Sequence, residues 1–323
     1  MKKMIKVILI ALLVIAVLLI AVIAVLIGLS HEKNNHYYKY TTTGGDLEAK
    51  YTALGSYSVS FMEFDTDDEV CKKFSVWYPT EMKDSKKTYP MVVIANGTGS
   101  KASAYSAVFE HLASWGFIVI GNDDENSRTG ASSAATLEFM LKQNEDDSSI
   151  FFGKINTQKV GISGHSQGGV GSINAVTAQE NGSMYKAMYV ASPTSNYWGQ
   201  EHIFGKEWSY DVSKISIPCF IVAGTGAFDS GTATSITATE GQGICPLWDM
   251  EYNYNTIPAS VNKVMGRLVG KDHGDLMYCA DGYMTAWFMY WLNDDEDAGK
   301  AFFGENAEIY SNKNWQDVRT NGY

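Results

Sequence analysis

The chain has 323 residues, a formal net charge of -11, and 45% hydrophobic and 13% aromatic residues. These totals suit one large globular domain of about 250 residues with additional segments, and the aromatic content argues against a disordered chain. The acidic balance argues against a nucleic-acid partner, because phosphate binding needs a basic face.

The N-terminus carries an apolar run from Val7 to Leu29 that contains neither charge nor proline. A helix of this length spans roughly 34 Å, which is enough to cross a bilayer. Lys2, Lys3 and Lys6 precede the run and are expected to stay in the cytoplasm. We therefore expect residues 7–29 to lie in the membrane.

This run suggests a three-part chain: a transmembrane anchor over residues 1–30, a polar stalk over 31–54 and one folded domain over 55–323. The predicted location is the cell membrane, with a single span and the domain outside the cytoplasm. The alternative is a cleaved signal peptide followed by a secreted domain.

Strands and helices alternate along the domain. Two runs with alternating polarity predict an antiparallel hairpin, and continuous apolar runs predict strands covered on both faces. This alternation predicts an α/β fold with a mostly parallel central sheet flanked by helices. The hairpin is expected over 57–61 and 73–78, later strands over 91–95, 117–120, 160–165, 187–190, 219–223 and 263–269, and helices over 105–115, 134–141, 167–178 and 282–292.

A Gly-x-Ser-x-Gly pattern places Ser166 between Gly164 and Gly168, after an apolar strand and before a helix. A serine hydroxyl attacks well only when it stands clear of the backbone beside a base. A sharp strand-to-helix turn provides this, and it brings the two elements so close that glycine is needed at both flanks. The pattern predicts the nucleophile of an α/β-hydrolase fold.

In this fold the acid and then the histidine follow the serine along the chain. Among six histidines, His273 follows the last predicted parallel strand and can reach over Ser166. The loop after the strand at 219–223 supplies Asp229 as the acid. Asp272 and Asp275 flank the histidine and are interpreted as solvated loop charges. Ser166, Asp229 and His273 form the predicted catalytic triad.

An oxyanion hole needs two backbone N–H groups, one from the residue after the nucleophile and one from the loop after the third strand. These positions are Gln167 and Thr98, the latter in a glycine-rich loop. The alternatives for that loop are a plain glycine turn or a glycosylation acceptor at Asn96.

The cysteines differ in setting. Cys71 and Cys219 fall in or beside apolar strand-like runs and are expected to be packed thiols. Cys245 and Cys279 lie in loop or helix-start positions, and we predict a disulfide between them. No cysteine or histidine spacing resembles a zinc site, so no metal is predicted.

The span from about Pro90 to Asp295 resembles bacterial polyester hydrolases of the cutinase-like and PET-hydrolase branch, which is related to dienelactone-hydrolase and chlorophyllase-like esterases. The resemblance implies a serine ester hydrolase that forms an acyl-enzyme and needs no cofactor. The residues that carry it are Pro90-Met91-Val92-Val93-Ile94, the run from His111 to Ile120, the Ser166 pattern, Ile217-Pro218-Cys219 and Ala286-Trp287-Phe288-Met289.

The chain departs from this family at the cleft. Thr98 stands where these enzymes usually carry an aromatic residue, and Gln167 stands where they usually carry methionine. Tyr197, Trp198 and Trp248 are candidates for binding an apolar or aromatic acyl group, or for packing a long loop.

Two other functions stay open at this point. An acyltransferase of the same fold would pass the acyl group to an alcohol rather than to water. A non-catalytic surface binding protein would keep the fold without the reaction, because fold does not fix function.

Overall fold

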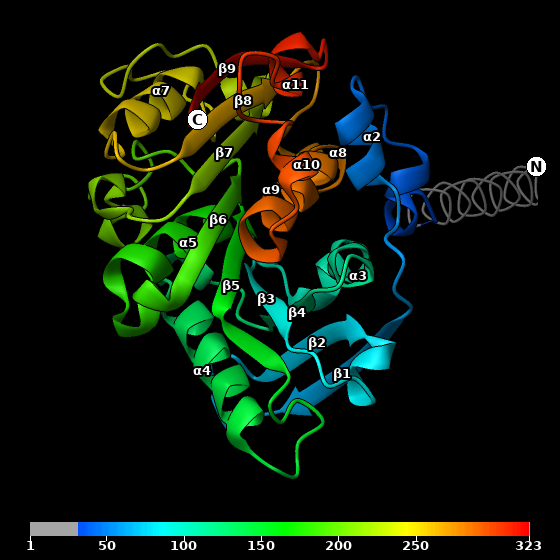
Figure 1. Cartoon of the computed structure of the whole chain (residues 1–323). Helices are drawn as coiled ribbons and strands as arrows, with labels where there is room; N and C mark the ends of the chain where they lie inside the picture. Colours follow the sequence, from blue (N-terminus) through cyan, green and yellow to red (C-terminus); the bar gives the residue numbers. More distant parts are fainter. Residues whose placement is uncertain (1–31, 323) are drawn as a thin grey trace, which may run out of the picture.

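The computed structural model describes residues 32–322, in which nine strands form one sheet in the order β1-β2-β4-β3-β5-β6-β7-β8-β9 (Figure 1). Strands β3 to β8 pair in parallel, and β1, β2 and β9 add antiparallel edges. The predicted α/β class with a mostly parallel sheet is therefore confirmed. The strands are β1 (Val59–Asp65), β2 (Lys73–Pro79), β3 (Tyr89–Ala95), β4 (Ile118–Asn122), β5 (Ile155–His165), β6 (Tyr185–Ala191), β7 (Cys219–Gly224), β8 (Lys263–Leu268) and β9 (Trp315–Asn321).

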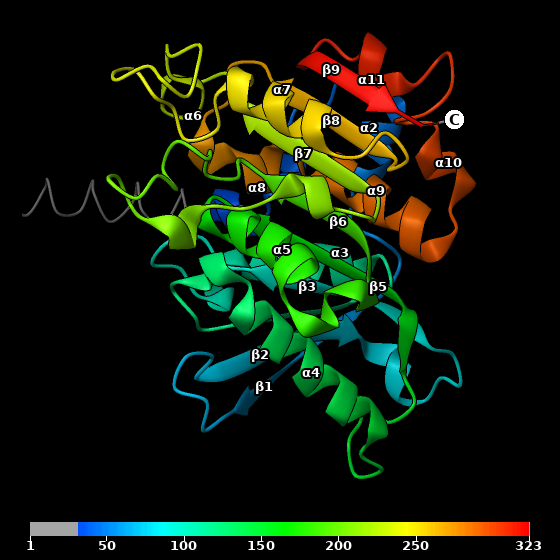
Figure 2. The same ribbon diagram turned by 90° about the vertical axis from the view of Figure 1, so that its left-hand side faces the viewer.

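Helices cover both faces of the sheet. One face packs against α3 (Ser106–Ser114) and α9 (Asp281–Asn293). The other packs against α4 (Ala131–Glu145), α5 (Gln167–Ala178) and α7 (Leu247–Thr256), which Figure 2 shows in front of the sheet. Strands β3, β7 and β8 are buried along their whole length, and β3 carries the continuous apolar run that predicted a strand covered on both faces.

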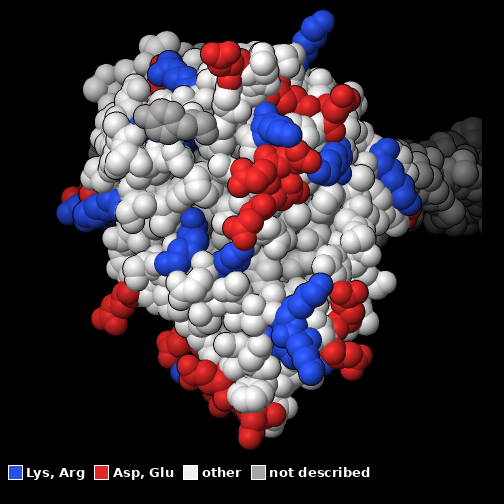
Figure 3. Space-filling model, in the orientation of Figure 1, with Lys and Arg blue, Asp and Glu red and all other residues white. Residues whose placement is uncertain are grey.

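The C-terminal tail, for which the sequence offered no interpretation, completes the sheet. The short helices α10 (Glu296–Gly299) and α11 (Glu308–Ser311) lead to β9, which pairs with β8. Acidic side chains gather over α10 in Figure 3, where Asp294, Glu296 and Asp297 are exposed.

The segment expected to be a polar stalk is instead packed on the domain. Residues Tyr37–Lys39 form a 3-10 turn and Asp46–Thr52 form helix α2, which contacts α9. The prediction missed this because three of its side chains, Tyr37, Glu48 and Tyr51, find partners far along the chain and are buried. The Glu48 carboxylate, for example, accepts hydrogen bonds from Asn312 and from the Trp315 indole.

The predicted anchor at residues 7–29 lies outside the described residues and stays a prediction. Within residues 32–322, no helix is long and apolar enough to cross a membrane.

The predicted disulfide between Cys245 and Cys279 is wrong, because both residues are free thiols. Cys245 is buried in the core beneath α5 and α7, whereas Cys279 packs against the core on the α3 and α9 face. The sheet therefore separates the two sulfur atoms. Cys71 and Cys219 are buried free thiols, as expected.

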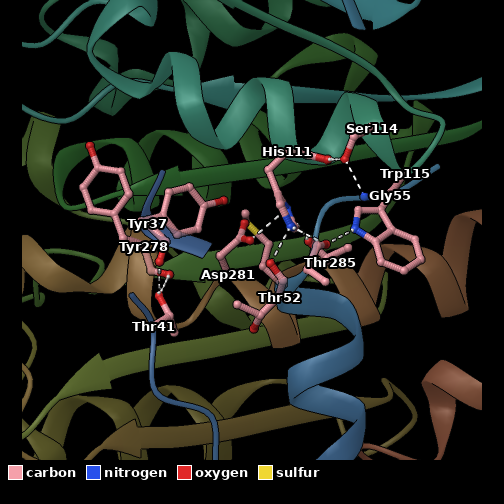
Figure 4. Close-up of polar contacts among 12 residues, drawn as sticks. Tyr37, Thr41, Thr52, Gly55, His111, Ser114, Trp115, Tyr278, Asp281 and Thr285 are labelled. Carbon is pink, nitrogen blue, oxygen red and sulfur yellow. Dashed lines mark hydrogen bonds and ion pairs between the residues drawn. The ribbon is translucent and has the colours of Figure 1, made fainter. Parts of the chain in front are cut away.

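A buried ion pair joins α2, α3 and α9 (Figure 4). His111 Nδ1 lies 2.8 Å from Asp281 Oδ2, and both side chains are fully buried. His111 Nε2 lies 3.0 Å and 2.9 Å from the carbonyl oxygens of Thr52 and Ala53, which can only accept a hydrogen bond. Burial lowers the pKa of His111, but Asp281 and the two carbonyl groups outweigh it and hold the pKa above its ordinary value.

We expect Asp281→Asn to lower the free energy of unfolding by about 3–5 kcal/mol, because it leaves a buried imidazolium without its counter-ion. Because the pKa of His111 is raised in the folded state, the ion pair contributes its full stabilisation of the fold below the unfolded-state pKa of about 6.5. That contribution is lost as the pH rises through the folded-state pKa. Urea unfolding at about pH 6 and about pH 9 checks both points.

The control is Glu138→Gln, which removes an exposed ion pair with Lys142 on α4 and should change stability little at either pH. Equal stability of wild type and Asp281→Asn at the lower pH would contradict this account of the pair.

Candidate active site

Ser166 lies at a sharp turn between β5 and α5, with a φ of 59°, which is rare for a residue other than glycine. A Cβ atom on Gly164 would lie 2.2 Å from the Gly168 carbonyl oxygen, and a Cβ atom on Gly168 would lie 2.2 Å from the Ala95 carbonyl oxygen. No side chain fits at either position. The two glycines therefore allow the close approach that holds Ser166 in its strained conformation.

The loops after β7 and β8 bring Asp229 and His273 together, because neighbouring parallel strands end at the same edge of the sheet. His273 Nδ1 lies 3.0 Å from Asp229 Oδ1. The carboxylate is fully buried, and its other oxygen accepts from Ser192 Oγ at 2.7 Å and from the Gly224 N–H at 2.5 Å. A carboxylate held in this way can orient the imidazole and fix the proton on Nδ1.

Asp272 is not the solvated loop charge that the sequence suggested. Its carboxylate accepts the backbone N–H groups of Phe228, Asp229 and His273. Burial raises the pKa of Asp272, but these three donors and the nearby His273 outweigh it and bring the pKa below its ordinary value. The Asp272 carboxylate therefore links the loop that carries Asp229 to the loop that carries His273.

His165 also supports the histidine loop, a role that sequence reasoning missed. Its Nε2 lies 2.7 Å from the His273 carbonyl oxygen, which can only accept, so Nε2 carries a proton. The two imidazole rings lie 4.5 Å apart. Burial and the neighbouring His273 lower the pKa of His165 to about 4. The His165 side chain is therefore neutral at physiological pH and adds no second charge beside His273.

Thr98 and Gln167, the two predicted oxyanion donors, differ in their access to the cleft. Thr98 lines the same cleft as Ser166, whereas Gln167, the first residue of α5, is fully buried and does not line it. The first N–H groups of a helix have no partner within the helix. Within residues 32–322 the Thr98 N–H also donates to no protein acceptor. The Gln167 side chain is buried, and among the described residues its amide nitrogen and oxygen have no hydrogen-bond partner.

Ser166 and His273 open into a cleft of about 870 Å³ that is lined by aromatic, aliphatic and small polar residues. The three residues predicted to bind the acyl group do not line this cleft. Trp198 packs behind Phe204 at 5.0 Å, Tyr197 packs on Trp198, and Trp248 lines a separate hollow of about 530 Å³. The aromatic side chains that line the cleft are Tyr105, Phe204, Trp208, Phe228 and Tyr278.

No metal centre accompanies these residues. Nowhere in the part of the chain that the structure describes do three or more histidine, cysteine or acidic side chains form a group that could hold a metal ion.

Comparison with known proteins identifies the family of this chain. A model of the family described as PET hydrolase-like matches residues 52–319. The chain belongs to the PET hydrolase-like family. This confirms the resemblance drawn from the sequence, and the matched span runs from the end of α2 into β9.

Several curated proteins are similar to this member of the PET hydrolase-like family. Cutinase est2 of Thermobifida alba is 26% identical over 229 residues, which cover 68% of this chain and 64% of that protein. Bis(hydroxyethyl) terephthalate hydrolase of Streptomyces coelicolor is 25% identical over 230 residues, covering 68% and 62%. Cutinase cut1 of Thermobifida fusca is 28% identical over 205 residues, covering 62% and 53%. The chain thus spans less than two thirds of the length of each of these relatives.

We expect Gly168→Ala to destabilise the folded chain by about 1–3 kcal/mol or more, because its Cβ atom would overlap the Ala95 carbonyl oxygen. Gly274→Ala is the matched control at the same cleft, since a Cβ atom there meets nothing within 4 Å. Thermal unfolding compares the two variants. Equal unfolding temperatures for both would show that the turn does not need glycine at position 168.

Proposed function

We propose that this chain is a serine ester hydrolase with an α/β-hydrolase fold, in which Ser166, Asp229 and His273 act as a catalytic triad. The observation that carries the proposal is the strained Ser166 turn opening into the cleft that also contains His273, with Asp229 3.0 Å from the imidazole. Membership of the PET hydrolase-like family supports it, since its curated relatives include cutinases and a bis(hydroxyethyl) terephthalate hydrolase.

In the proposed reaction, His273 takes the proton of the Ser166 hydroxyl as the oxygen attacks the ester carbonyl. The buried Asp229 carboxylate stabilises the imidazolium that forms. The backbone N–H groups of Thr98 and Gln167 bind the oxyanion, and each contributes about 3 kcal/mol to the transition state. The imidazolium then gives its proton to the departing alcohol, and water hydrolyses the acyl-enzyme by the same steps.

The cleft walls favour an ester with an apolar or aromatic acyl group. Phe204, Trp208 and Phe228 line the same cleft as Ser166 and His273, and aromatic groups pack well on aromatic surfaces. Phe228 lies edge-on to the His273 ring at 5.5 Å and is 62% exposed, so it is available to a substrate at the mouth of the cleft.

We expect Ser166→Ala to lower kcat for a nitrophenyl ester by about 10⁶-fold, because the nucleophile is lost while the fold is kept. Asp229→Asn should lower it by about 10⁴-fold through the wrong imidazole tautomer. The assay measures release of free acid and alcohol, and thermal unfolding checks the fold.

Ser103→Ala is the control, since this exposed serine precedes the cleft residues Ala104 and Tyr105 and accepts a hydrogen bond from Ser106 through its backbone carbonyl, which alanine keeps. This variant should keep full activity. Hydrolysis retained in Ser166→Ala would overturn the proposed function.

A further inference from the structure

Tyr105 places a phenol hydroxyl beside the proposed oxyanion loop. It ends the 3-10 turn Ala102–Tyr105, its ring lines the cleft together with Ser166 and Thr98, and only 8% of it is exposed. Its hydroxyl oxygen accepts the Gly97 N–H at 3.1 Å, and Gly97 directly precedes Thr98.

The close packing around Gly97 shows what lies near the Tyr105 hydroxyl. A Cβ atom on Gly97 would lie 2.8 Å from the Tyr105 hydroxyl oxygen and 3.4 Å from the carbonyl oxygen of His165, the residue before Ser166. The hydroxyl therefore lies where the loop of Thr98 and the turn of Ser166 approach each other.

A phenol has one proton to donate, and in Tyr105 this proton is not used by the protein. The Gly97 N–H donates to the hydroxyl oxygen, and within residues 32–322 the hydroxyl itself donates to no protein acceptor. Its neighbour Tyr278 differs, since that hydroxyl donates to the Ala104 carbonyl at 3.5 Å. Accepting a hydrogen bond also polarises a hydroxyl and makes it a stronger donor.

We propose that the Tyr105 hydroxyl is a third oxyanion donor, which supplements the N–H groups of Thr98 and Gln167. It donates its hydrogen bond to the ester carbonyl oxygen as negative charge develops there in the transition state, and it exchanges no proton. This inference rests on the proposed function of the cleft and adds a catalytic side chain to it.

The first test is Tyr105→Phe, which keeps the ring and removes the hydroxyl. We expect kcat to fall by about 10²-fold with little change in KM, because the bond is strongest in the transition state. Tyr185→Phe is the matched control: it removes a buried tyrosine hydroxyl that donates to the Ser133 carbonyl instead, and it should leave kcat unchanged. Unchanged kcat in Tyr105→Phe would overturn the proposal.

A second variant separates donation to substrate from support of the loop. Tyr105→3-fluorotyrosine makes the hydroxyl a stronger donor and a weaker acceptor for Gly97, with almost no change in size. Donation to the oxyanion predicts a kcat equal to or above that of the wild type, whereas a role confined to holding Gly97 predicts a lower kcat. A lower kcat would therefore overturn the proposal, even if Tyr105→Phe fails to fold. A wild type without ester hydrolysis would instead overturn the function on which the proposal rests.

Discussion

The close approach of β5 and α5 around Ser166 is the constraint on which the rest of the cleft depends. Gly164 and Gly168 leave no space for a Cβ atom, and the chain between them is forced into a left-handed conformation at a serine. Such strain persists only when the surroundings impose it. Here the imposing structure is the parallel sheet, in which β5 pairs with β3 on one side and with β6 on the other up to His165, the residue before Ser166.

The second determinant is a set of polar contacts that position Asp229 and the His273 loop. Ser192 and Gly224 donate hydrogen bonds to Asp229, and the His273 loop is held by hydrogen bonds to Asp272 and His165. These contacts order two loops on a rigid scaffold, which is how preorganised sites limit the cost of reorganisation during a reaction. They do so without placing a second charged imidazole in the cleft, because the pKa of His165 is held low.

The sequence predicted the features that depend on local pattern. Apolar runs marked the buried strands, the two glycines marked the Ser166 turn, and chain order selected Asp229 and His273, which the structure places 3.0 Å apart. It could not predict which face of the sheet a residue would occupy, so Cys245 and Cys279 were wrongly paired across it. Nor could it predict partners distant along the chain, such as those that bury Glu48 in a segment rich in polar residues.

The most direct test of the central claim is covalent labelling of the intact protein with a fluorophosphonate, followed by peptide mapping. If Ser166 is an activated nucleophile beside His273, we expect one probe per chain on Ser166, together with loss of ester hydrolysis in proportion to labelling. Labelling of other serines at the same rate, or no label on Ser166, would contradict the account.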